Sequence, residues 1–430
     1  TRKESSAASD VYKRQLIMNI GILTFYKVNN FGANLQAVST YYNLIKKGHT
    51  PILIHYESKD SLERKHKKHN VQSQEHLNFL ERTVPNQTEI CYNENDIAKI
   101  IQKYNIEAII IGSDAVVQHH PLLARIRKGK RKPFYITKTL PETTFPNCFW
   151  GVGITESIPM AMMSVSSQNS EYKFFSKSLK EKMKKALERM KYISVRDEWT
   201  QKMFLAISSN LNIQVTPDPV FAFNQNAEQF IPTEEELRQK YSLPDRYVLV
   251  SLHSQSLSEQ QLFKLKVGFE EKGLECVAFT MPTGIKFKHP FTKKIDIPLP
   301  PEDWYGLLKY ASAYVGSNMH PIVVCLHNAV PCFSIDHWGT RDFWGHHKND
   351  GSSKVNDILK IFELQEYIVP IEEDHCPVNP SYIVDKIVSF PRQKVLAKSK
   401  DMNNIYEKMM EKIISCLINK SSSKQSKIGY

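Results

Sequence analysis

The sequence predicts an α/β protein in which two Rossmann-like, doubly wound domains face each other across a cleft. Apolar runs of strand length alternate with helical patterns from Met18 onward, which is typical of parallel sheets covered by helices. The alternation stops at a polar stretch, 224–245, and then starts again. A chain of 430 residues is also long enough for two domains. We therefore predict a first domain at 18–240, a second domain at 241–378, and helices at 379–418 that return to the first domain.

The two ends of the chain lack the patterns of a folded segment. Residues 1–17 are polar and without periodicity, and we expect a leader that is not part of the fold. Residues 419–430 are rich in Ser and Lys, which predicts a disordered tail. No run approaches the roughly 20 apolar residues of a membrane helix, and the first residues do not resemble a signal peptide. We therefore expect a cytoplasmic protein.

The first domain begins with a strand, a helix and a second strand. Leu35, Val38, Tyr42 and Ile45 recur at helical spacing between the two apolar runs. A βαβ unit of this kind implies a parallel sheet. The segment 57–95 has no clear pattern and predicts no element. The elements predicted here are strands at 18–25, 50–56, 106–114, 147–154 and 213–223, helices at 33–48, 96–104 and 178–191, and a strand turning into a helix at 192–204.

The second domain repeats the alternation. The helix at 320–329 opens on His320, with Pro321 in the first turn, where a missing N–H costs nothing. Asn318 stands where it can cap this helix. Amphipathic helices follow at 381–418, and we expect the last of them to pack on the first domain. The other predicted elements are strands at 246–253, 274–280, 311–317 and 329–335, and helices at 258–273, at 301–311 and from 352 onward.

The seven cysteines include no C-x-x-C pair and no metal-binding spacing. Cys276, Cys325 and Cys332 sit inside apolar runs. Because buried thiols behave as small apolar side chains, we expect reduced cysteines and neither disulfides nor a structural zinc.

The formal net charge of +12 suggests an anionic partner. Much of this charge lies at the two ends and in the segment 122–138, which contains no acidic residue. Such a segment is a candidate for contact with anionic lipid headgroups, a phosphorylated carbohydrate or nucleic acid, and a solvated loop without a partner is the plainer interpretation. Because the excess charge is confined to these segments, we expect no nucleic-acid partner.

Candidate functional residues collect at the carboxyl ends of the predicted strands, where parallel sheets place their ligands. These residues come from both domains, are polar, and carry both signs of charge. They suit a cleft that holds a small polar or anionic ligand. The candidates are Asn29, Asn30, Gly32, Asn34, Ser113, Asp114, Arg196, Asp197, Asp218, His253, Ser254, Ser317, Asn318 and His320.

Each candidate also has a purely structural interpretation. Asn30 and Gly32 suit a tight turn, and Asp114 and Asp218 suit a helix cap or a turn. Arg196 suits an ion pair with its neighbour in the sequence. The chain has neither a G-x-G-x-x-G after the first strand nor a P-loop motif, which argues against dinucleotide and P-loop chemistry.

His320 is the strongest candidate. A helix begins at this histidine, and the free N–H groups and positive end of a helix favour an anion. An imidazole also donates or accepts a proton near neutral pH. Arg341, in the glycine-containing loop that follows, and Lys354, at the next helix start, are candidate anion clamps. The histidines of that loop have no regular spacing, so we expect no metal.

In their order, these segments resemble the polysaccharide pyruvyl transferase family. Asn30, Gly32 and Gln36 match an N-x-G-x-x-L-Q motif at the start of the first helix. A late histidine that begins a helix matches His320, although this chain has SNMHP where the family usually has an S-x-[RF]-x-H-G pattern. The resemblance spans about residues 18–366, and its segments include "NFGANLQ", "IIIGSDAVV", "YISVRDE", "TPDPVFAF", "GSNMHPIVVCLHNAVPCFSID" and "SSKVNDILKIFEL".

The resemblance implies a GT-B-like fold and the transfer of pyruvate from phosphoenolpyruvate onto two hydroxyls of a sugar, forming a cyclic ketal. The acceptor would be a sugar or a lipid-linked oligosaccharide of a cell-surface polysaccharide, and the segment 122–138 could then meet the membrane surface. The chemistry needs an acid, a base and cations for the donor, and no cofactor. We assign catalysis to His320, Asp114 and Asp218, donor binding to His320, Arg341, Lys354, Ser317, Asn318 and His253, and acceptor binding to Asn30, Gly32, Asn34, Gln36 and Arg196.

Two other functions fit the same cleft. A nucleotide-sugar-dependent GT-B glycosyltransferase would need an aromatic side chain for the base and a carboxylate for the ribose, and the sequence identifies neither. A non-catalytic glycan-binding or nucleic-acid-binding relative would use the segment 122–138. Binding to a phosphate backbone would fall steeply with salt.

Overall fold

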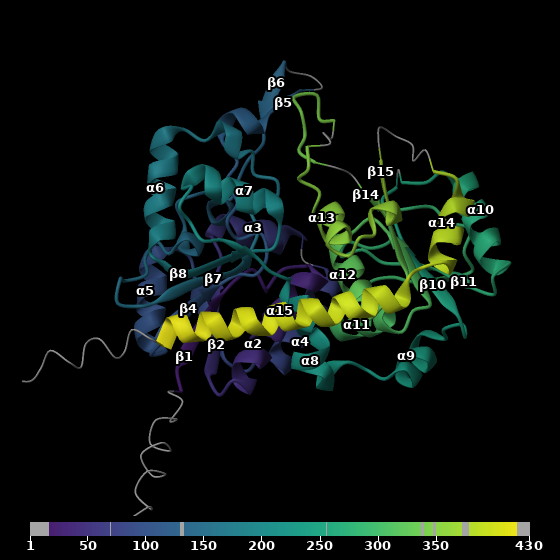
Figure 1. Ribbon diagram of the computed structural model, residues 1–430, viewed down its shortest axis with the longest axis horizontal. Coiled ribbons are helices and arrows are strands. Elements are labelled where there is room, and N and C mark those ends of the chain that lie inside the picture. Colours follow the sequence, from purple (N-terminus) through teal and green to yellow (C-terminus); the bar gives the residue numbers. More distant parts are fainter. Residues whose placement is uncertain are drawn as a thin grey trace, which may run out of the picture.

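The computed structural model describes residues 17–68, 70–129, 133–254, 256–336, 339–346, 350–371 and 378–418. It contains two large sheets, one in each half of the chain, in which every pair of strands is parallel (Figure 1). The predicted fold class is therefore confirmed. The predicted leader and tail lie outside the described residues, apart from Ile17.

The first sheet has seven strands in the order β3-β2-β1-β4-β7-β8-β9. β4 reads Ala-Ile-Ile-Ile and is buried on both faces, as a central parallel strand between two helix layers should be. The strands are β1 (Asn19–Leu23), β2 (Thr50–Tyr56), β3 (Gln87–Cys91), β4 (Ala108–Ile111), β7 (Met160–Val165), β8 (Met190–Val195) and β9 (Gln214–Val215).

Helices cover both faces of this sheet. One face packs against α2, α4 and the C-terminal α15, and the other packs against α5, α6 and α7. Each set contributes to a separate apolar cluster, so the domain has the two-layered core of a doubly wound fold. The helices are α2 (Phe31–Lys46), α3 (Lys59–Lys68), α4 (Val71–Thr83), α5 (Glu94–Lys103), α6 (Lys177–Glu188), α7 (Glu198–Ile207) and α8 (Phe223–Ala227).

The second sheet has six strands in the order β12-β11-β10-β13-β14-β15. Its strands are β10 (Tyr247–Ser251), β11 (Glu275–Phe279), β12 (Lys293–Ile295), β13 (Ala313–Gly316), β14 (Cys332–Asp336) and β15 (Ile368–Pro370). Among its helices, α10 packs on α14, and α11 packs on α12. The helices of this half are α9 (Glu234–Tyr241), α10 (Glu259–Glu270), α11 (Pro301–Lys309), α12 (Met319–His327), α13 (Lys354–Ile361) and α14 (Pro380–Val388).

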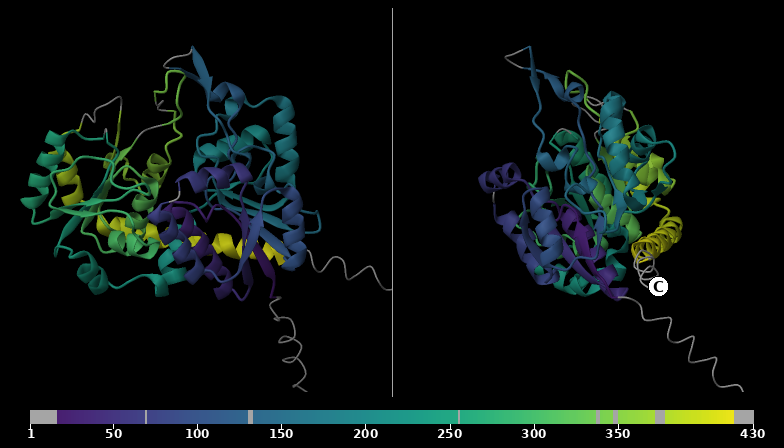
Figure 2. Two further views of the ribbon diagram at one scale, coloured as in Figure 1. Left: turned by 180° about the vertical axis from the view of Figure 1, so that it is seen from behind. Right: turned by 90° about the vertical axis from the view of Figure 1, so that its left-hand side faces the viewer.

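The last helix, α15 (Arg392–Ile418), runs along both halves of the molecule (Figures 1 and 2). It contacts α12 in the second half and β7 and β8 in the first. Its buried residues join the same apolar cluster as α2 and the second sheet, so the two halves share a continuous core. The predicted return of the C-terminal helix to the first domain is therefore confirmed.

Two predicted strands of the first half are wrong. The segment 147–154 holds a short 3-10 helix, Cys148–Trp150, and a turn in which Gly151 and Gly153 both have positive φ. Its apolar side chains are buried in the hydrophobic core, and a short run of buried apolar residues looks the same in the sequence whether it forms a strand or an irregular segment. The real strand is the next apolar run, β7. The segment 213–223 contains only the two residues of β9, followed by a 3-10 helix at Pro219–Ala222.

Other details extend the predictions. The unassigned segment 57–95 contains α3, α4 and β3. The helix predicted to open on His320 begins one residue earlier, at Met319, and Asn318 occupies the cap position without a capping side-chain hydrogen bond. All cysteines in the described part of the chain are free thiols, five of them buried, as expected. No helix among the described residues is long and apolar enough to cross a membrane.

Candidate functional site

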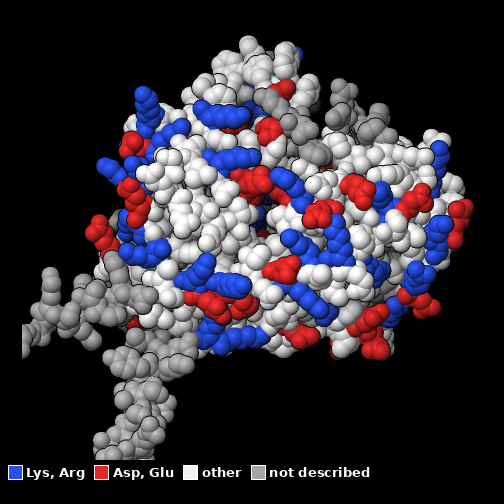
Figure 3. All heavy atoms as spheres, viewed as in Figure 1, with Lys and Arg blue, Asp and Glu red and all other residues white. Residues whose placement is uncertain are grey.

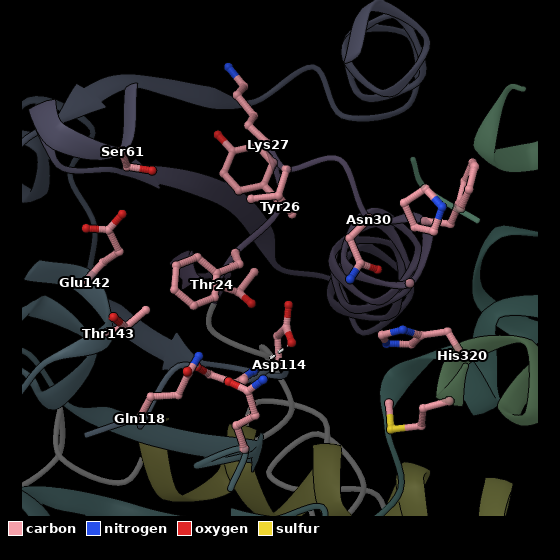
Figure 4. A pocket seen from close by; sticks show the side chains of 18 of the residues that line it. Thr24, Tyr26, Lys27, Asn30, Ser61, Asp114, Gln118, Glu142, Thr143 and His320 are labelled. Atoms are coloured by element: carbon pink, nitrogen blue, oxygen red, sulfur yellow. Dashed lines mark hydrogen bonds between the residues drawn. The ribbon is translucent and has the colours of Figure 1, made fainter. Parts of the chain in front are cut away.

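A cavity of about 520 Å³ opens between the two sheets, at the carboxyl ends of their strands. The first half lines it with the loops that follow β1, β2, β4, β7 and β8, and with α3. The second half lines it with the loop after β11, with α11, and with the first residues of α12 and α13. In Figure 4, His320 and Asn30 lie on one side of the cavity, Ser61, Glu142 and Thr143 on the other, and Asp114 between them.

His320 faces Gly32 across the boundary between the two halves. A Cβ atom on Gly32 would lie 2.1 Å from the imidazole ring, so only glycine leaves room for the histidine. The Nε2 atom of His320 is buried without a hydrogen-bond partner among the described residues. Burial lowers the pKa of His320, against the opposing effect of Asp218, so the neutral ring is favoured at pH 7.

Arg196 forms a buried ion-pair network behind His320. Its guanidinium contacts Asp218 at 2.6 Å and Asp114 at 3.6 Å. Asp218 is buried at 3% exposure and does not line the cavity, whereas Asp114 does. Asp114 has φ +78°, an unusual backbone conformation for a residue with a side chain. Its backbone carbonyl accepts hydrogen bonds from Val116 and Ser166, which hold it in place.

Lys354 completes the positively charged end of the cavity. It is the first residue of α13, whose cap is the Ser353 side chain. Among the described residues its ammonium has neither an ion pair nor a hydrogen bond, and burial lowers the pKa of Lys354 to about 8. The N-termini of α2, α12 and α13 also meet at this end, and helix N-termini favour anions.

The opposite end of the cavity is built from the first half alone. Glu57 is buried and binds Lys65 at 2.7 Å, Ser61 at 2.7 Å and His55 at 3.2 Å. Burial by itself would raise the pKa of Glu57, but His55 and Lys65 hold it below the usual value. Glu142 is 2% exposed, and its Oε2 atom has no partner among the described residues. This end therefore offers carboxylates and a hydroxyl, which are groups that bind sugar hydroxyls.

The structure brings together part of the predicted site. Asn30, Gly32, Asp114, Arg196, Asn318, His320 and Lys354 all line the cavity. Their predicted roles are functional proposals, but the structure does show that they converge from five separate segments of the chain.

Other predicted site residues lie behind the cavity wall or away from it. Gln36 is buried and donates to Thr24 Oγ1 at 3.0 Å and accepts from the Ser113 N–H at 3.1 Å, so it ties two cavity loops together. Asn34 is buried and bonds to the Tyr26 carbonyl and to His76. Neither side chain lines the cavity, and both make their hydrogen bonds inside the fold.

The predicted donor ligands Ser317, His253 and Arg341 do not line the cavity either. Ser317 is buried beside Ser256, with 3.2 Å between their hydroxyl oxygens. Arg341 is exposed at the protein surface. The cationic groups that line the positive end are Arg196, from the first half, and Lys354, from the second.

Sequence reasoning missed the opposite end of the cavity. Glu57 directly follows β2 and thus stands at a strand end, but it lies in the segment that predicted no element. Glu142 belongs to a 3-10 helix, Pro141–Thr143, and not to the end of a predicted strand, so no local pattern marks it. Trp304 also lines the cavity, stacked on Phe31 with ring centroids 4.9 Å apart.

Comparison with known proteins identifies the family. The sequence model of the family described as polysaccharide pyruvyl transferase matches residues 30–339, more than half of the chain. This chain belongs to the polysaccharide pyruvyl transferase family. The matched region includes Asn30, Gly32, Asp114, Arg196 and His320, and it ends before Lys354. No curated protein matches the sequence.

Solved structures resemble this pyruvyl transferase family member only distantly. A UDP-GlcNAc 2-epimerase from Methanocaldococcus jannaschii, in complex with UDP-GlcNAc and UDP, has a TM-score of 0.46 and 12% identity, covering 90% of this chain and 100% of that one. An Anabaena protein in complex with UDP and glucose has a TM-score of 0.45 and 9% identity, covering 95% and 100%. At this similarity neither structure indicates the ligand of this chain.

Proposed function

We propose that this protein transfers pyruvate from phosphoenolpyruvate onto two hydroxyls of a sugar and so forms a cyclic ketal. The observation that carries the proposal is the pair of unpartnered groups at the positive end of the cavity. The Nε2 atom of His320 is buried, and neither this atom nor the Lys354 ammonium, which lines the same end of the cavity, has a partner among the described residues. A buried polar atom without a partner and an ammonium whose pKa is lowered by desolvation together favour an anion between them.

The donor supplies two anionic groups, a phosphate and a carboxylate. Lys354 and the N-terminus of α12 suit the phosphate, because the side chain of the cap residue Asn318 makes no capping hydrogen bond there. Arg196 suits the carboxylate as far as its pairs with Asp114 and Asp218 allow. Asp218 acts through Arg196 in this scheme and is a positioning residue.

The reaction needs a proton on the methylene carbon of the donor. A bound phosphate dianion raises the pKa of a neighbouring imidazole, so donor binding would convert neutral His320 into a proton donor. C2 then carries positive charge, and one sugar hydroxyl attacks it while a carboxylate takes the hydroxyl proton. Asp114 lines the cavity between its two ends and suits this role. Departure of phosphate and attack by the second hydroxyl close the ring.

The sugar would occupy the end formed by Glu57, Ser61 and Glu142. The free Oε2 atom of Glu142 is an acceptor for a sugar hydroxyl. Trp304, on the second half, offers an aromatic surface in the same cavity. In this scheme Glu142→Gln weakens use of the acceptor and leaves binding of the donor unchanged.

A thermal-shift titration of the full chain tests the donor. Phosphoenolpyruvate is compared with UDP-, GDP- and CDP-sugars, since a ligand that binds only the native state raises the melting temperature. We expect phosphoenolpyruvate alone to stabilise the wild type, and His320→Ala and Lys354→Met to lose the effect. Lys360→Met is the matched control, because this lysine lies on the same helix but pairs with Glu198 at 3.2 Å. If a nucleotide sugar stabilises the protein and phosphoenolpyruvate does not, the proposal is wrong and a glycosyltransferase activity takes its place.

A further inference from the structure

A two-stranded hairpin projects from the first half of the molecule. β5 (Ile126–Lys128) and β6 (Phe134–Ile136) pair antiparallel and extend beyond the body of the protein in every view (Figures 1 and 2). Large apolar side chains are exposed on the hairpin and on the 3-10 helix Leu122–Arg125 that leads into it, unlike in an ordinary solvated loop. Leu123 is 64% exposed and Phe134 is 55% exposed. Such side chains, gathered on one projection, indicate a surface that meets an apolar partner.

A loop from the second half joins the hairpin. The Lys128 N–H donates to the Phe343 carbonyl at 2.8 Å, and the Lys128 ammonium lies 4.0 Å from the centre of the Trp344 ring. Trp344 is 60% exposed. The two segments therefore form one surface, which we call the hairpin surface, made of Leu122, Leu123, Phe134, Tyr135, Ile136, Phe343 and Trp344.

The hairpin surface belongs largely to a basic segment of the chain. The segment 122–138 carries seven Lys and Arg and no Asp or Glu, and three of the seven, at 130–132, lie outside the described residues. The adjoining loop contains the acidic residues Asp342 and Asp350; the N–H of His346 donates to Asp342 at 2.9 Å, and the Thr340 hydroxyl donates to Asp350. Elsewhere, on the face drawn in Figure 3, Lys and Arg stand beside Asp and Glu without separating into regions of one sign.

We propose that the hairpin surface docks the protein on an anionic lipid membrane. Aromatic side chains favour the boundary between headgroups and acyl chains, and Lys and Arg beside them favour anionic headgroups. The hairpin surface combines both on a projection that reaches the membrane without the body of the protein. A nucleic-acid partner would use the charge but would leave the aliphatic Leu122, Leu123 and Ile136 in water.

This docking is independent of the reaction catalysed, but it has a consequence for the cavity. Leu140, Glu142 and Thr143 line the cavity and follow β6 closely along the chain. The wall that we assign to the acceptor therefore continues directly into the hairpin surface. A docked protein would present this wall to a lipid-linked sugar.

Vesicle co-sedimentation of the full chain tests the proposal. Phosphatidylcholine vesicles are compared with vesicles that also contain phosphatidylglycerol, at low and high salt. We expect binding to the anionic vesicles, weaker binding at high salt, and little binding to the neutral ones. Each basic residue near an anionic membrane contributes about fivefold to binding, so the double variant Lys128→Glu with Lys138→Glu should lower the vesicle partition coefficient at least about 25-fold. Phe134→Ser with Trp344→Ser lowers it at least about tenfold.

The control variant carries Phe263→Ser with Lys264→Glu, an exposed aromatic and an exposed lysine on α10. It removes one exposed aromatic and reverses one exposed lysine away from the hairpin, one change of each kind made in the two hairpin variants, and should bind as the wild type does. Melting temperatures of all variants exclude unfolding as a cause. The proposal is overturned if the wild type ignores anionic vesicles, if the hairpin variants bind like the control, or if the protein binds single-stranded RNA and no vesicle.

Discussion

Gly32→Ala is the sharpest test of the contact between the two halves. The new Cβ atom would lie 2.1 Å from the His320 ring, and ordinary contact begins at 3.4 Å, so the ring must move by about 1.3 Å. The backbone of Gly32 does not require glycine, because its φ is not positive, and Ala favours a helix by about 1 kcal/mol. The strain of overpacking, about 1–3 kcal/mol, offsets this gain, so the melting temperature should change by only a few degrees.

Activity should respond far more than stability. A misplacement of about 1 Å at a reacting group costs about 100-fold in rate, so we expect kcat/KM for phosphate release to fall by about that factor. Gly268→Ala is the control, since its Cβ meets only the Val384 side chain, at 3.1 Å. In a His320→Ala background, Gly32→Ala should have almost no further effect, because the clash is gone. Activity of Gly32→Ala within about threefold of the wild type would refute the geometry on which the site rests.

Three further predictions concern buried charges. Lys354 is protonated below its pKa of about 8, so the affinity for the donor, measured by calorimetry, should fall as the pH rises through 8. The Lys354→Met variant should bind the donor weakly at every pH. Burial, with Asp197 and Glu198, raises the pKa of Asp357 from 3.8 to about 7. The folded state then binds more protons between pH 4 and 7 and loses stability as pH rises through that window. Asp357→Asn should therefore be more stable than the wild type at pH 8, by at most about 4 kcal/mol, with a difference in urea-unfolding free energy that vanishes near pH 4. Arg196→Met should cost about 3–5 kcal/mol in the same urea experiment, since it leaves Asp218 buried without its cation, and an unchanged midpoint would contradict the network.

Local pattern in the sequence was sufficient for most of the architecture. The alternation of apolar runs and helical spacing predicted two parallel sheets, and the rule that ligands bind at strand ends selected Asp114, Arg196 and His320. Local pattern gave the wrong element at 147–154. Cys148 and Trp150 are buried in the hydrophobic core without forming a strand, and they produce the same apolar run as a central strand.

Only the tertiary structure decided which strand-end residues face the ligand. Sequence gives the position of a residue along its strand, but the direction of its side chain depends on what the neighbouring elements leave open. Gln36 and Asp218 turn inward to bind Ser113 and Arg196, while Lys354 and Glu142 turn toward the cavity. The closeness of Gly32 to His320 joins residues nearly 290 positions apart, so no local pattern contains it. The sequence therefore predicted most of the helices and strands, whereas the arrangement of the site depends on how those elements pack.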